Sequence, residues 1–532
     1  MNEKLKLLIK NNAFKIKQKT TLKKLKKLVD NSDYHIEENK DSKKIIFNLI
    51  YGMYGKIIFW ETAIAKSLQL RGHDIKALIC GKTFNMCTTE YTIQSVHDEK
   101  TCDHCKEFSE EFLKTIDIPF SIYGNYITKD ETKKIEGNIN KLPIEKCKTY
   151  LYKNIEVGAL SLNSVIRYFK GSLKPDPSEY DRVLRNELIN AIIAIDVAEK
   201  VYKEEKPDVL VTRHLGYSSW GSFAEYFMKK GVKVCSPGEG YSPKTIYFDM
   251  DDVKNEFSRY IKEVRNNKIL NKNEEKELDV FLNKRFKGID GDTADYEFTK
   301  HNLPENEFNF EDYDKTYAIF PNVPWDSSLL NANKVFNDVY EWISYSIDLF
   351  RKKPNFQLIT KIHPSETKVM KSENTVHDYI KNTESNLPDN IKIIPPNTDI
   401  SPYSLFPYID KGIVYNGTIG LELVLNKIPV IVAGVTHYGD KGFTFDANTK
   451  KEYEKLIFKD LKISKKQYDL ARVYAFFYFI KTFIPYDYVL SNKKTLNYMW
   501  NVKDIKEFSR GNDKYLDHIC DYISEGVVYQ DW

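Results

Sequence analysis

Two short polar segments combine residue types that can bind a phosphate. Lys361, His363 and Pro364 follow an apolar run at 356–360, and the segment Asn416-Gly417-Thr418-Ile419-Gly420-Leu421-Glu422 follows another at 412–415. A lysine or histidine at a strand end can meet a phosphate or a carboxylate, and a glycine-containing turn before a helix leaves backbone N–H groups available. Both segments therefore predict contacts with an anionic ligand.

The 416–422 segment has the chemistry of a turn that carries a strand into a helix. Thr418 is the expected N-cap, so the first N–H groups of the helix would face a ligand at the carboxyl edge of the sheet. We expect the phosphates of a nucleotide to meet Asn416, Gly417, Thr418, Ile419 and Gly420. Glu422, one helical turn further, can accept hydrogen bonds from the ribose, although an ordinary capped turn would show the same local pattern.

The 361–364 segment adds two side chains at alternate positions. Lys361 and His363 share one face if the strand continues through them, because side chains alternate across a sheet. Pro364 cannot donate to a sheet and therefore ends the strand. We expect Lys361 and His363 to hold the same phosphate, and His363 can give a proton to a departing phosphate near neutral pH.

Alternating strands and helices position these segments. In the first half, strands are expected at 44–51, 74–80, 207–212 and 231–235, and helices at 57–70 and 219–230. In the second half, strands are expected at 316–320, 356–362, 391–394, 412–415 and 428–433, and helices at 334–350, from 418 onward and at 464–486. This alternation predicts parallel sheets covered by helices on both faces.

A charged, weakly patterned stretch at 251–312 separates the two series. Two such series predict the α/β architecture called GT-B, in which two Rossmann-like parallel-sheet domains face a cleft and C-terminal helices cross back to the first domain. We expect a basic leader at 1–40, an acceptor-side domain at 41–312, a nucleotide-sugar domain at 313–463 and the returning helices at 464–532.

An ordered set of motifs resembles bacterial capsule polysaccharide biosynthesis proteins, a family that includes Kdo transferases. The motifs lie at 238–243, 320–328, 361–364, 415–422, 429–434 and 437–444. The resemblance implies a GT-B glycosyltransferase that moves a sugar from a nucleotide-sugar donor to a cell-surface glycan, free or lipid-linked, without an obligatory metal. Within 437–444 we expect Tyr438 to contact the donor. Pro324-Trp325-Asp326-Ser327-Ser328 stands where the Kdo enzymes carry a glutamine-containing pattern, so the resemblance does not fix the donor sugar.

Transfer with inversion needs a general base that deprotonates the attacking hydroxyl. Glu239 is the first candidate, because we expect it in a glycine-flanked loop beyond the strand at 232–235. His214, Glu61 and, from the second domain, Asp326 are the further candidates. Each of these three also has an ordinary structural interpretation, as a core hydrogen-bonding group, a helix surface charge and a helix cap respectively.

Other functions fit the same frame. A CDP-polyol phosphotransferase would use two histidines, for which His214 and His363 are available. A UDP-sugar 2-epimerase would need no acceptor, and a catalytically silent component of capsule assembly would need no donor. A dinucleotide-dependent oxidoreductase is rejected, because the 52–55 turn, Gly-Met-Tyr-Gly, lacks the Gly-x-Gly-x-x-Gly spacing.

Four of the seven cysteines cluster in the first half of the chain, at Cys80, Cys87, Cys102 and Cys105. A Cys-x-x-Cys pair with two further thiols could hold a structural zinc ion, and reduced structural thiols are the alternative. The cluster is remote in sequence from the donor motifs, so we expect no catalytic metal.

The leader is strongly basic. Residues 1–27 hold ten lysines and one acid, Glu3, interleaved with apolar residues. Such a segment could lie on an anionic membrane surface or form a solvated leader. Without a membrane-spanning apolar run or a signal sequence, we expect a cytoplasmic protein that can associate with the inner face of the membrane. The formal net charge of the whole chain is only +4, so nucleic-acid binding has little support.

Overall fold

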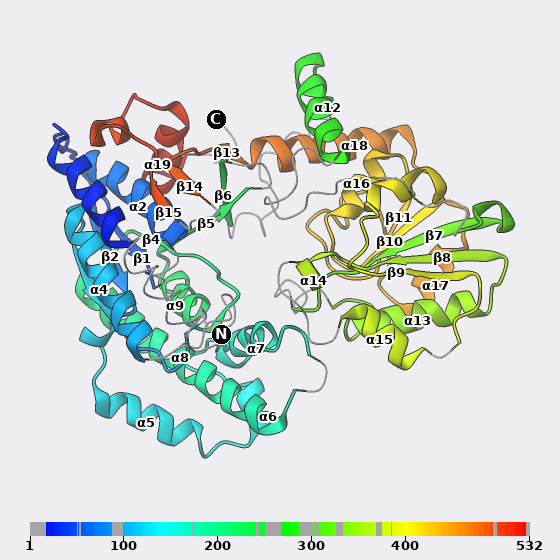
Figure 1. Cartoon of the computed structure of the whole chain (residues 1–532), viewed down its shortest axis with the longest axis horizontal. Coiled ribbons are helices and arrows are strands. Elements are labelled where there is room, and N and C mark those ends of the chain that lie inside the picture. Colours follow the sequence, from blue (N-terminus) through cyan, green and yellow to red (C-terminus); the bar gives the residue numbers. More distant parts are fainter. Residues whose placement is uncertain are drawn as a thin grey trace, which may run out of the picture.

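The structure is a computed structural model that describes residues 18–50, 52, 55–87, 99–172, 175–240, 244–249, 268–287, 303, 308–325, 333–368, 375–384, 386–492 and 497–527. Its strands form a seven-stranded sheet, a six-stranded sheet and a hairpin of β14 (Val489–Asn492) and β15 (Asn497–Trp500). The two large sheets lie in separate lobes of the chain (Figure 1).

The first sheet has the strand order β13-β6-β5-β4-β1-β2-β3. β1 pairs in parallel with β2 and β4, whereas β6 runs antiparallel to β5 and β13. The strands are β1 (Lys44–Asn48), β2 (Asp74–Ile79), β3 (Phe120–Ile122), β4 (Val209–Val211), β5 (Lys233–Glu239), β6 (Thr245–Asp249) and β13 (Ile484–Pro485). The helices of this part are α2 (Gly55–Leu70), α4 (Glu99–Thr115), α5 (Lys129–Ile139), α6 (Ile144–Lys148), α7 (Val157–Tyr168), α8 (Pro177–Glu205) and α9 (Ser218–Lys229).

Helices cover both faces of the first sheet. Ile45 and Phe47 of β1 lie in a core with α2 and α19 (Lys514–Glu525), whereas Ile46 lies in a core with α8 and α9. This alternation is the period-two geometry of a strand. The sequence of a central strand that is buried on both faces is one continuous apolar run.

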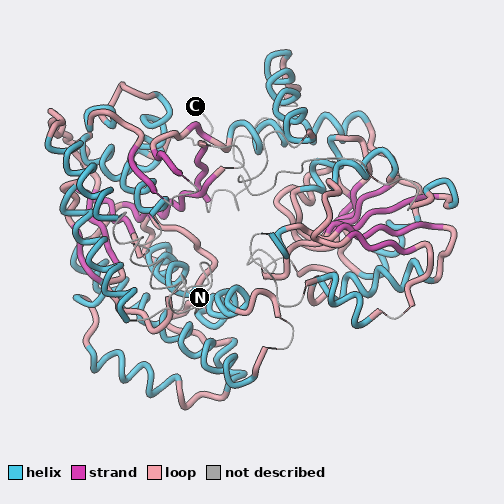
Figure 2. Tube along the Cα trace, in the orientation of Figure 1, coloured by secondary structure: helices cyan, strands magenta, loops and turns pink. Residues whose placement is uncertain are grey.

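The second sheet has the order β12-β11-β10-β7-β8-β9, and all its pairs are parallel. Its strands are β7 (Lys315–Phe320), β8 (Phe356–Lys361), β9 (Ile391–Ile394), β10 (Lys411–Val414), β11 (Val430–Val432) and β12 (Phe445–Asp446). Ala318 and Phe320 of β7 lie in a core with α16 (Ile419–Leu425) and α18 (Lys465–Ala475). Tyr317 and Ile319 lie in a core with α13 (Val339–Arg351) and α17 (Lys450–Phe458). Figure 2 shows these strands enclosed between helices.

Two further segments complete the second part. The short helices α14 (Ser365–Lys368) and α15 (Val376–Thr383) follow β8. α12 (Lys272–Phe286) lies within the charged stretch at 251–312, of which residues 251–267 lie outside the described residues. The helix expected from 334 begins at Val339 instead, because Asp338 caps it by accepting hydrogen bonds from the backbone N–H groups of Tyr340 and Glu341.

The chain returns to the first sheet at its C-terminal end. α18 continues into a π-helical segment (Phe476–Lys481), and β13 then pairs with β6 through Ile484 and Ile246. The single helix expected over 464–486 is therefore wrong in its last turn, where Pro485 cannot donate a helical hydrogen bond. Trp500 of β15 donates from Nε1 to the carbonyl oxygen of Phe59 on α2 at 2.9 Å. The predicted α/β fold, with two Rossmann-like domains and C-terminal elements that cross back, is confirmed, although antiparallel β6 and β13 at one edge make the first sheet mixed rather than purely parallel.

Part of the basic leader belongs to the first domain. Residues 18–30 form a helix whose Leu22 and Leu25 are buried in the core beside α2, while Lys19, Lys23, Lys24, Lys26 and Lys27 are exposed. These two leucines are therefore not available to enter a membrane, and the rest of the predicted membrane segment, residues 1–17, lies outside the described residues. Within the described ranges, we find no helix with the length and hydrophobicity that a bilayer span requires.

Candidate functional site

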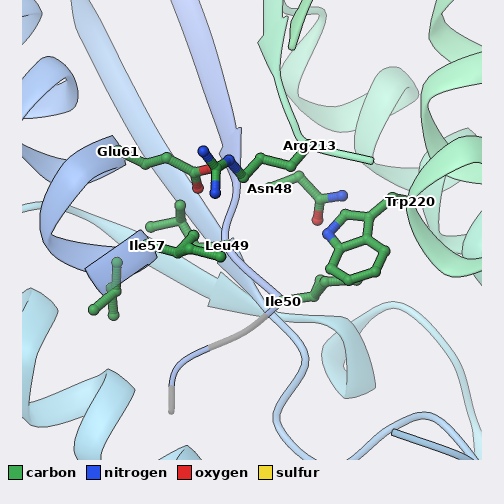
Figure 3. A pocket seen from close by; sticks show the side chains of 8 residues that line it. Asn48, Leu49, Ile50, Ile57, Glu61, Arg213 and Trp220 are labelled. Atoms are coloured by element: carbon green, nitrogen blue, oxygen red, sulfur yellow. The ribbon is translucent and has the colours of Figure 1, made fainter. Parts of the chain in front are cut away.

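The first sheet has its topological switch point between β1 and β4. From β1 the chain continues to β2 and β3 on one side, whereas β4 is followed by β5 and β6 on the other. Ligands of open α/β sheets bind in the crevice that such a switch point opens at the carboxyl ends of the strands. A pocket occurs at this place, lined by residues of β1, α2 and α9 and of the segments that follow β1 and β4: Asn48, Leu49, Ile50, Ile57, Ile58, Glu61, Arg213 and Trp220 (Figure 3).

Glu61 and Arg213 bring opposite charges together in this pocket. Glu61 Oε1 lies 3.1 Å from Arg213 Nε, and both side chains are almost completely buried. The Nε–H of Arg213, however, donates to the carbonyl oxygen of Pro237 at 2.8 Å. Among the described residues, Glu61 Oε1 therefore has no hydrogen-bond partner although it is buried. A buried oxygen without a partner is costly, so this atom is ready to accept a proton or a hydrogen bond.

Burial raises the pKa of the Glu61 carboxyl to about 7, and the charge of Arg213 acts in the opposite direction. A carboxyl with a pKa near the working pH is suited to general base catalysis, since it is ionised often enough to accept a proton and basic enough to hold it. Sequence reasoning placed Glu61 below Glu239, because a single glutamate on a helix gives no sign of burial.

Glu239 is not in a loop, as the sequence had suggested. It is the last residue of β5 and pairs with Ile246 of β6, because β5 and β6 form an antiparallel ladder through this region. Gly238 permits that packing, since a Cβ there would lie 2.3 Å from the ring of Tyr247. The Glu239 side chain is 39% exposed and forms an ion pair with Lys56 of α2. Lys56 in turn lies with Nζ 5.9 Å from the ring centroid of Trp60, and the guanidinium of Arg213 lies 5.1 Å from the same centroid.

His214 directly follows Arg213 and adopts a left-handed backbone conformation with φ of 54°. Its exposed ring meets Trp220 edge-on, with ring centroids 5.1 Å apart. Desolvation by the surrounding protein lowers the pKa of His214, and the charges of Arg213 and Arg167, which repel a proton, lower it further. The imidazole is thus neutral at physiological pH. Its neighbour Trp220 lines the pocket, whereas His214 is not among the lining residues.

The second sheet has its switch point between β7 and β10. The segment 416–420 follows β10, and Asn322 follows β7. Asn322 Oδ1 accepts a hydrogen bond from the backbone N–H of Asn416 at 3.1 Å, which ties the two loops together. Asn416, Gly417, Thr418 and Ile419 are half-buried, so the turn keeps contact with solvent. Asn322 was not singled out from the sequence, although its place directly after a buried strand was the signal.

Tyr438 lies beneath this turn. Its side chain is fully buried, and its hydroxyl donates to the carbonyl oxygen of Gly417 at 2.5 Å. A Cβ on Gly420 would lie 2.1 Å from the same hydroxyl, so only glycine fits there. The predicted donor residue Tyr438 thus supports the turn from inside. Thr418 occupies the N-cap position, but its side chain makes no capping hydrogen bond and its backbone is already helical, which differs from the expected cap.

Glu422 has a protein partner. Its Oε1 lies 2.5 Å from Nε of Arg285 on α12, and both side chains are buried. The predicted ribose contact stays a prediction, and it would require this ion pair to open. Nothing in the sequence indicates this pairing, because 136 residues lie between Arg285 and Glu422 and only the tertiary fold brings them together.

Lys361 and His363 end in different environments. β8 stops at Lys361, which is 3% exposed and whose Nζ donates to the carbonyl oxygen of Ile362 at 3.3 Å and to Thr398 Oγ1 at 3.4 Å. His363 lies beyond the strand and is exposed, with Nδ1 accepting from the Ser365 backbone N–H at 3.2 Å. The expectation that both share one strand face is therefore wrong, because the strand ends too early. Both residues still lie at the carboxyl end of β8, which neighbours β7.

Glu366 was missed by sequence reasoning as a functional residue. It is fully buried one turn after His363, and burial raises the pKa of its carboxyl to about 8. Oε2 accepts a hydrogen bond from the Val376 backbone N–H at 2.8 Å, whereas Oε1 has no partner among the described residues. The loops after β7, β8 and β10 thus converge at one edge of the sheet, with a lysine, a histidine and a neutral acid beside a glycine-containing turn.

Residues of the loop after β7 contact the first domain. Trp325 lies under the guanidinium of Arg167 on α7, at 4.7 Å from its ring centroid, and packs with Val323 against Ile166. The Tyr340 hydroxyl of α13 donates to the carbonyl oxygen of Gly171 at 3.3 Å. Asp326, the candidate base of the second domain, lies outside the described residues.

The four clustered cysteines do not form a ready metal site. Across the described residues, no group of three or more His, Cys, Asp or Glu side chains is arranged to hold a metal ion. The zinc expectation therefore stays a prediction, and so does the expectation that transfer needs no metal.

The similarity to a known protein family lies mainly in the second domain. Residues 250–484 match the family described as "Capsule polysaccharide biosynthesis protein", and this range contains the loops after β7, β8 and β10. The motif at 238–243 lies outside it. No curated protein matches the chain significantly.

Several solved structures are similar at low identity. The β Kdo 2,4 transferase of Thermosulfurimonas dismutans KpsC is 11% identical, with a TM-score of 0.36 over 57% of this chain and 88% of that chain. The β Kdo 2,7 transferase of the same protein is 13% identical, with a TM-score of 0.31 over 52% and 78%. A UDP complex of S. aureus MnaA is 11% identical, with a TM-score of 0.25 over 81% and 91%. Residues 250–484 are thus similar to the capsule polysaccharide biosynthesis protein family, and this match confirms the resemblance carried by the motifs within that range.

Proposed function

We propose that the protein is a glycosyltransferase that moves a sugar from a nucleotide-sugar donor to a cell-surface glycan of the capsule type, free or lipid-linked. The observation that carries this proposal is the convergence of the loops after β7, β8 and β10 at the switch point of the second sheet, within the family region. A switch point is where open α/β sheets bind nucleotides.

The donor phosphates lie against the turn at Asn416, Gly417, Thr418, Ile419 and Gly420. Lys361 and His363 supply cationic or hydrogen-bonding groups from the adjacent strand end, and Asn322 holds the turn in place. The solvent exposure of these residues supports this assignment of roles. His363 and the 416–419 turn reach solvent, where a ligand can contact them, whereas the buried Tyr438 supports the turn from inside. Negative charge on the departing nucleotide is then stabilised by groups of this chain, so no metal ion is required.

The acceptor hydroxyl enters the pocket at the switch point of the first sheet, where Glu61 is the general base. Glu61 Oε1 accepts the hydroxyl proton, the hydroxyl oxygen forms a bond to the anomeric carbon, and the bond from that carbon to the nucleotide phosphate breaks. The electron pair leaves with the nucleotide. Glu61 is favoured over Glu239 because it is buried, has an oxygen without a partner and carries a pKa near 7.

The first experiment is a thermal-shift series with the full chain and UDP, GDP, CMP, CDP and dTDP. A ligand that binds only the folded protein at about 100 times its Kd stabilises it by about 2.7 kcal/mol, so one nucleotide should raise Tm and the others should not. Product analysis with the matching nucleotide sugar then separates the possibilities. A new glycosidic bond on a glycan acceptor supports the proposal. A sugar changed without an acceptor, a transferred polyol phosphate or no nucleotide binding would each overturn it.

A further inference from the structure

Arg167 extends from α7 of the first domain to the loop after β7 of the second. Its guanidinium carbon lies 4.7 Å from the ring centroid of Trp325, and the neighbouring Ile166 packs against the same loop. A Cβ on Gly171, which follows α7, would lie 2.7 Å from Cβ of Pro324, so the two backbones approach each other closely. The guanidinium is therefore held at the boundary between the two domains.

Two donor side chains at this boundary have no acceptor within the described part of the chain. Trp325 is 7% exposed, and its Nε1 makes no hydrogen bond. Arg167 is half-buried, and among the described side chains no acid forms an ion pair with its guanidinium. A buried donor without an acceptor is costly, and a guanidinium has five N–H groups to satisfy. The two side chains therefore lack the acceptor that an anionic ligand would supply.

On the side of the first domain, Arg167 lies near the loop after β4. Its charge is one cause of the lowered pKa of His214 in that loop. The His214 ring meets Trp220, which lines the Glu61 pocket. Since the imidazole is neutral, the positive charge at this place comes from Arg167 and Arg213. Arg167 thus lies between the pocket of the proposed base and the second domain.

On the side of the second domain, the loop after β7 connects Arg167 with the turn that we propose binds the donor phosphates. Asn322 of this loop accepts the hydrogen bond from the backbone N–H of Asn416, and a Cβ on Gly417 would lie 4.0 Å from Asn322 Oδ1. Trp325 follows Asn322 by three residues, which span at most about 11 Å of chain. A nucleotide sugar that rests on the turn can therefore reach the guanidinium.

We propose that Arg167 binds a phosphate oxygen of the nucleotide-sugar donor, so that the first domain completes the donor site. This inference rests on the proposed function. A guanidinium is always charged, and its planar fork matches two phosphate oxygens. The ring of Trp325 holds the plane of the fork, and the Nε1–H is a further donor at the same place.

The role of Arg167 in transfer is electrostatic. The bond between the anomeric carbon and the phosphate oxygen breaks, and its electron pair stays on that oxygen. Hydrogen bonds from the guanidinium stabilise the negative charge that develops there. Arg167 forms no covalent bond and releases no proton. Because Lys361 and His363 belong to the second domain, the phosphates are bound from both sides only where the two domains meet.

The experiment compares two ligands of the full chain by calorimetry: the nucleotide that raises Tm in the thermal-shift series, and the matching nucleoside, which has no phosphate. Arg167→Met removes the charge and keeps a long side chain, so the Kd for the nucleotide should rise by about tenfold or more, while the Kd for the nucleoside should not change. Arg167→Lys keeps the charge without the fork and should give an intermediate Kd. Arg510→Met, which breaks a partly exposed ion pair with Asp521 on α19, is the control with wild-type Kd values.

An unchanged Kd for the nucleotide in Arg167→Met would overturn the inference. An equal loss for nucleotide and nucleoside would also overturn it, since a purely structural role would weaken both. A raised KM for the glycan acceptor at unchanged nucleotide Kd would assign the arginine to the acceptor instead. If Arg167→Met does not fold, Arg167→Lys decides by the same comparison. A wild-type chain that binds no nucleotide would refute the proposed function together with this inference, whereas normal nucleotide binding by both wild type and Arg167→Met would refute this inference alone.

Discussion

Glu61 and Arg213 face each other at 3.1 Å in the pocket of the first sheet, yet Arg213 gives its Nε–H to the carbonyl oxygen of Pro237 instead. The arginine thus supplies positive potential without satisfying the carboxylate oxygen that faces it. A carboxylate in this state keeps one oxygen for a ligand. Arg213 also stacks on Trp60, which fixes the guanidinium where it can lower the cost of an ionised Glu61.

Glu61→Gln tests the role of this oxygen. The amide keeps the size of the side chain but cannot accept the proton, so we expect turnover to fall by about 10²–10⁴-fold, the usual contribution of a general base. Donor nucleotide binding, followed by thermal shift, should stay unchanged because the proposed nucleotide site lies on the other domain. Glu225→Gln on α9, a half-buried acid away from the pocket, is the matched control.

Glu239→Gln separates the two candidate bases. It breaks only the partly exposed ion pair with Lys56, so a change in rate below about tenfold is expected. If Glu239→Gln abolished transfer while Glu61→Gln remained active, the assignment of the base from the structure would be wrong and the sequence-based candidate would be restored.

The pH profile of kcat/KM provides a second test of Glu61. Its pKa is raised to about 7 and the ionised form is the active one, so kcat/KM should rise with pH up to about 7 and then level off. The rise should be absent in Glu61→Gln. The pH dependence of stability runs the opposite way. The pKa of Glu61 is about 4.3 in the unfolded chain and is raised in the folded protein, so the folded state binds this proton more tightly. The contribution of Glu61 to the free energy of unfolding is therefore fully present below the unfolded pKa and is lost as the pH rises through about 7. If kcat/KM of Glu61→Gln still rose with pH up to about 7, the rise would have to come from the titration of another group.

The sequence was sufficient to place both polar segments at strand ends. Buried parallel strands are short apolar runs, and the residues after them must lie at the carboxyl edge of the sheet. The segments after β8 and β10 followed this rule. Local details did not, because the end of a strand depends on its neighbours: β8 stops at Lys361 and leaves His363 outside the ladder, and Thr418 lies in a helical backbone without capping.

Burial and pairing were the part that the sequence could not supply. Glu61, Glu366 and Glu422 are each buried, but nothing in their local sequence distinguishes them from exposed acids. Their environments come from elements far away in the chain, such as Arg213 for Glu61 and Arg285 for Glu422. The same applies to Glu239, whose flanking glycines suggest a loop until β6 is seen to pair with it.

Arg285 and Glu422 form a buried ion pair whose disruption should be costly. Removal of one partner leaves an uncompensated buried charge, so we expect Arg285→Met to lower the free energy of unfolding by about 3–5 kcal/mol in urea denaturation. The double variant Arg285→Met/Glu422→Leu should recover part of the loss. Arg182→Met, which breaks an exposed pair with Glu179, should change it by less than about 1 kcal/mol.

The same variants decide the role of Glu422 in donor binding. If Glu422 acts through its ion pair, Arg285→Met and Glu422→Gln should weaken nucleotide binding to the same extent. A much larger loss of affinity in Glu422→Gln alone would support the ribose contact expected from the sequence.

Tyr438 packs directly against Gly420 in the turn that we propose binds the donor, and this close contact predicts a steric effect at a position without a side chain. A Cβ on residue 420 would lie 2.1 Å from the Tyr438 hydroxyl and 2.8 Å from its ring carbon Cζ, so Gly420→Ala must displace either the turn or the tyrosine. We expect the Kd for the donor nucleotide, measured by calorimetry, to rise at least tenfold. Tyr438→Phe removes only the hydrogen bond to the Gly417 carbonyl oxygen, worth about 1 kcal/mol, and should raise Kd by about fivefold. Gly137→Ala on α5, where a Cβ would meet no atom within 4 Å, should leave Kd unchanged. Equal affinities in all three variants would show that the nucleotide does not rest on this turn, because a rigid anion-binding turn cannot absorb a 2.1 Å overlap without moving its N–H groups.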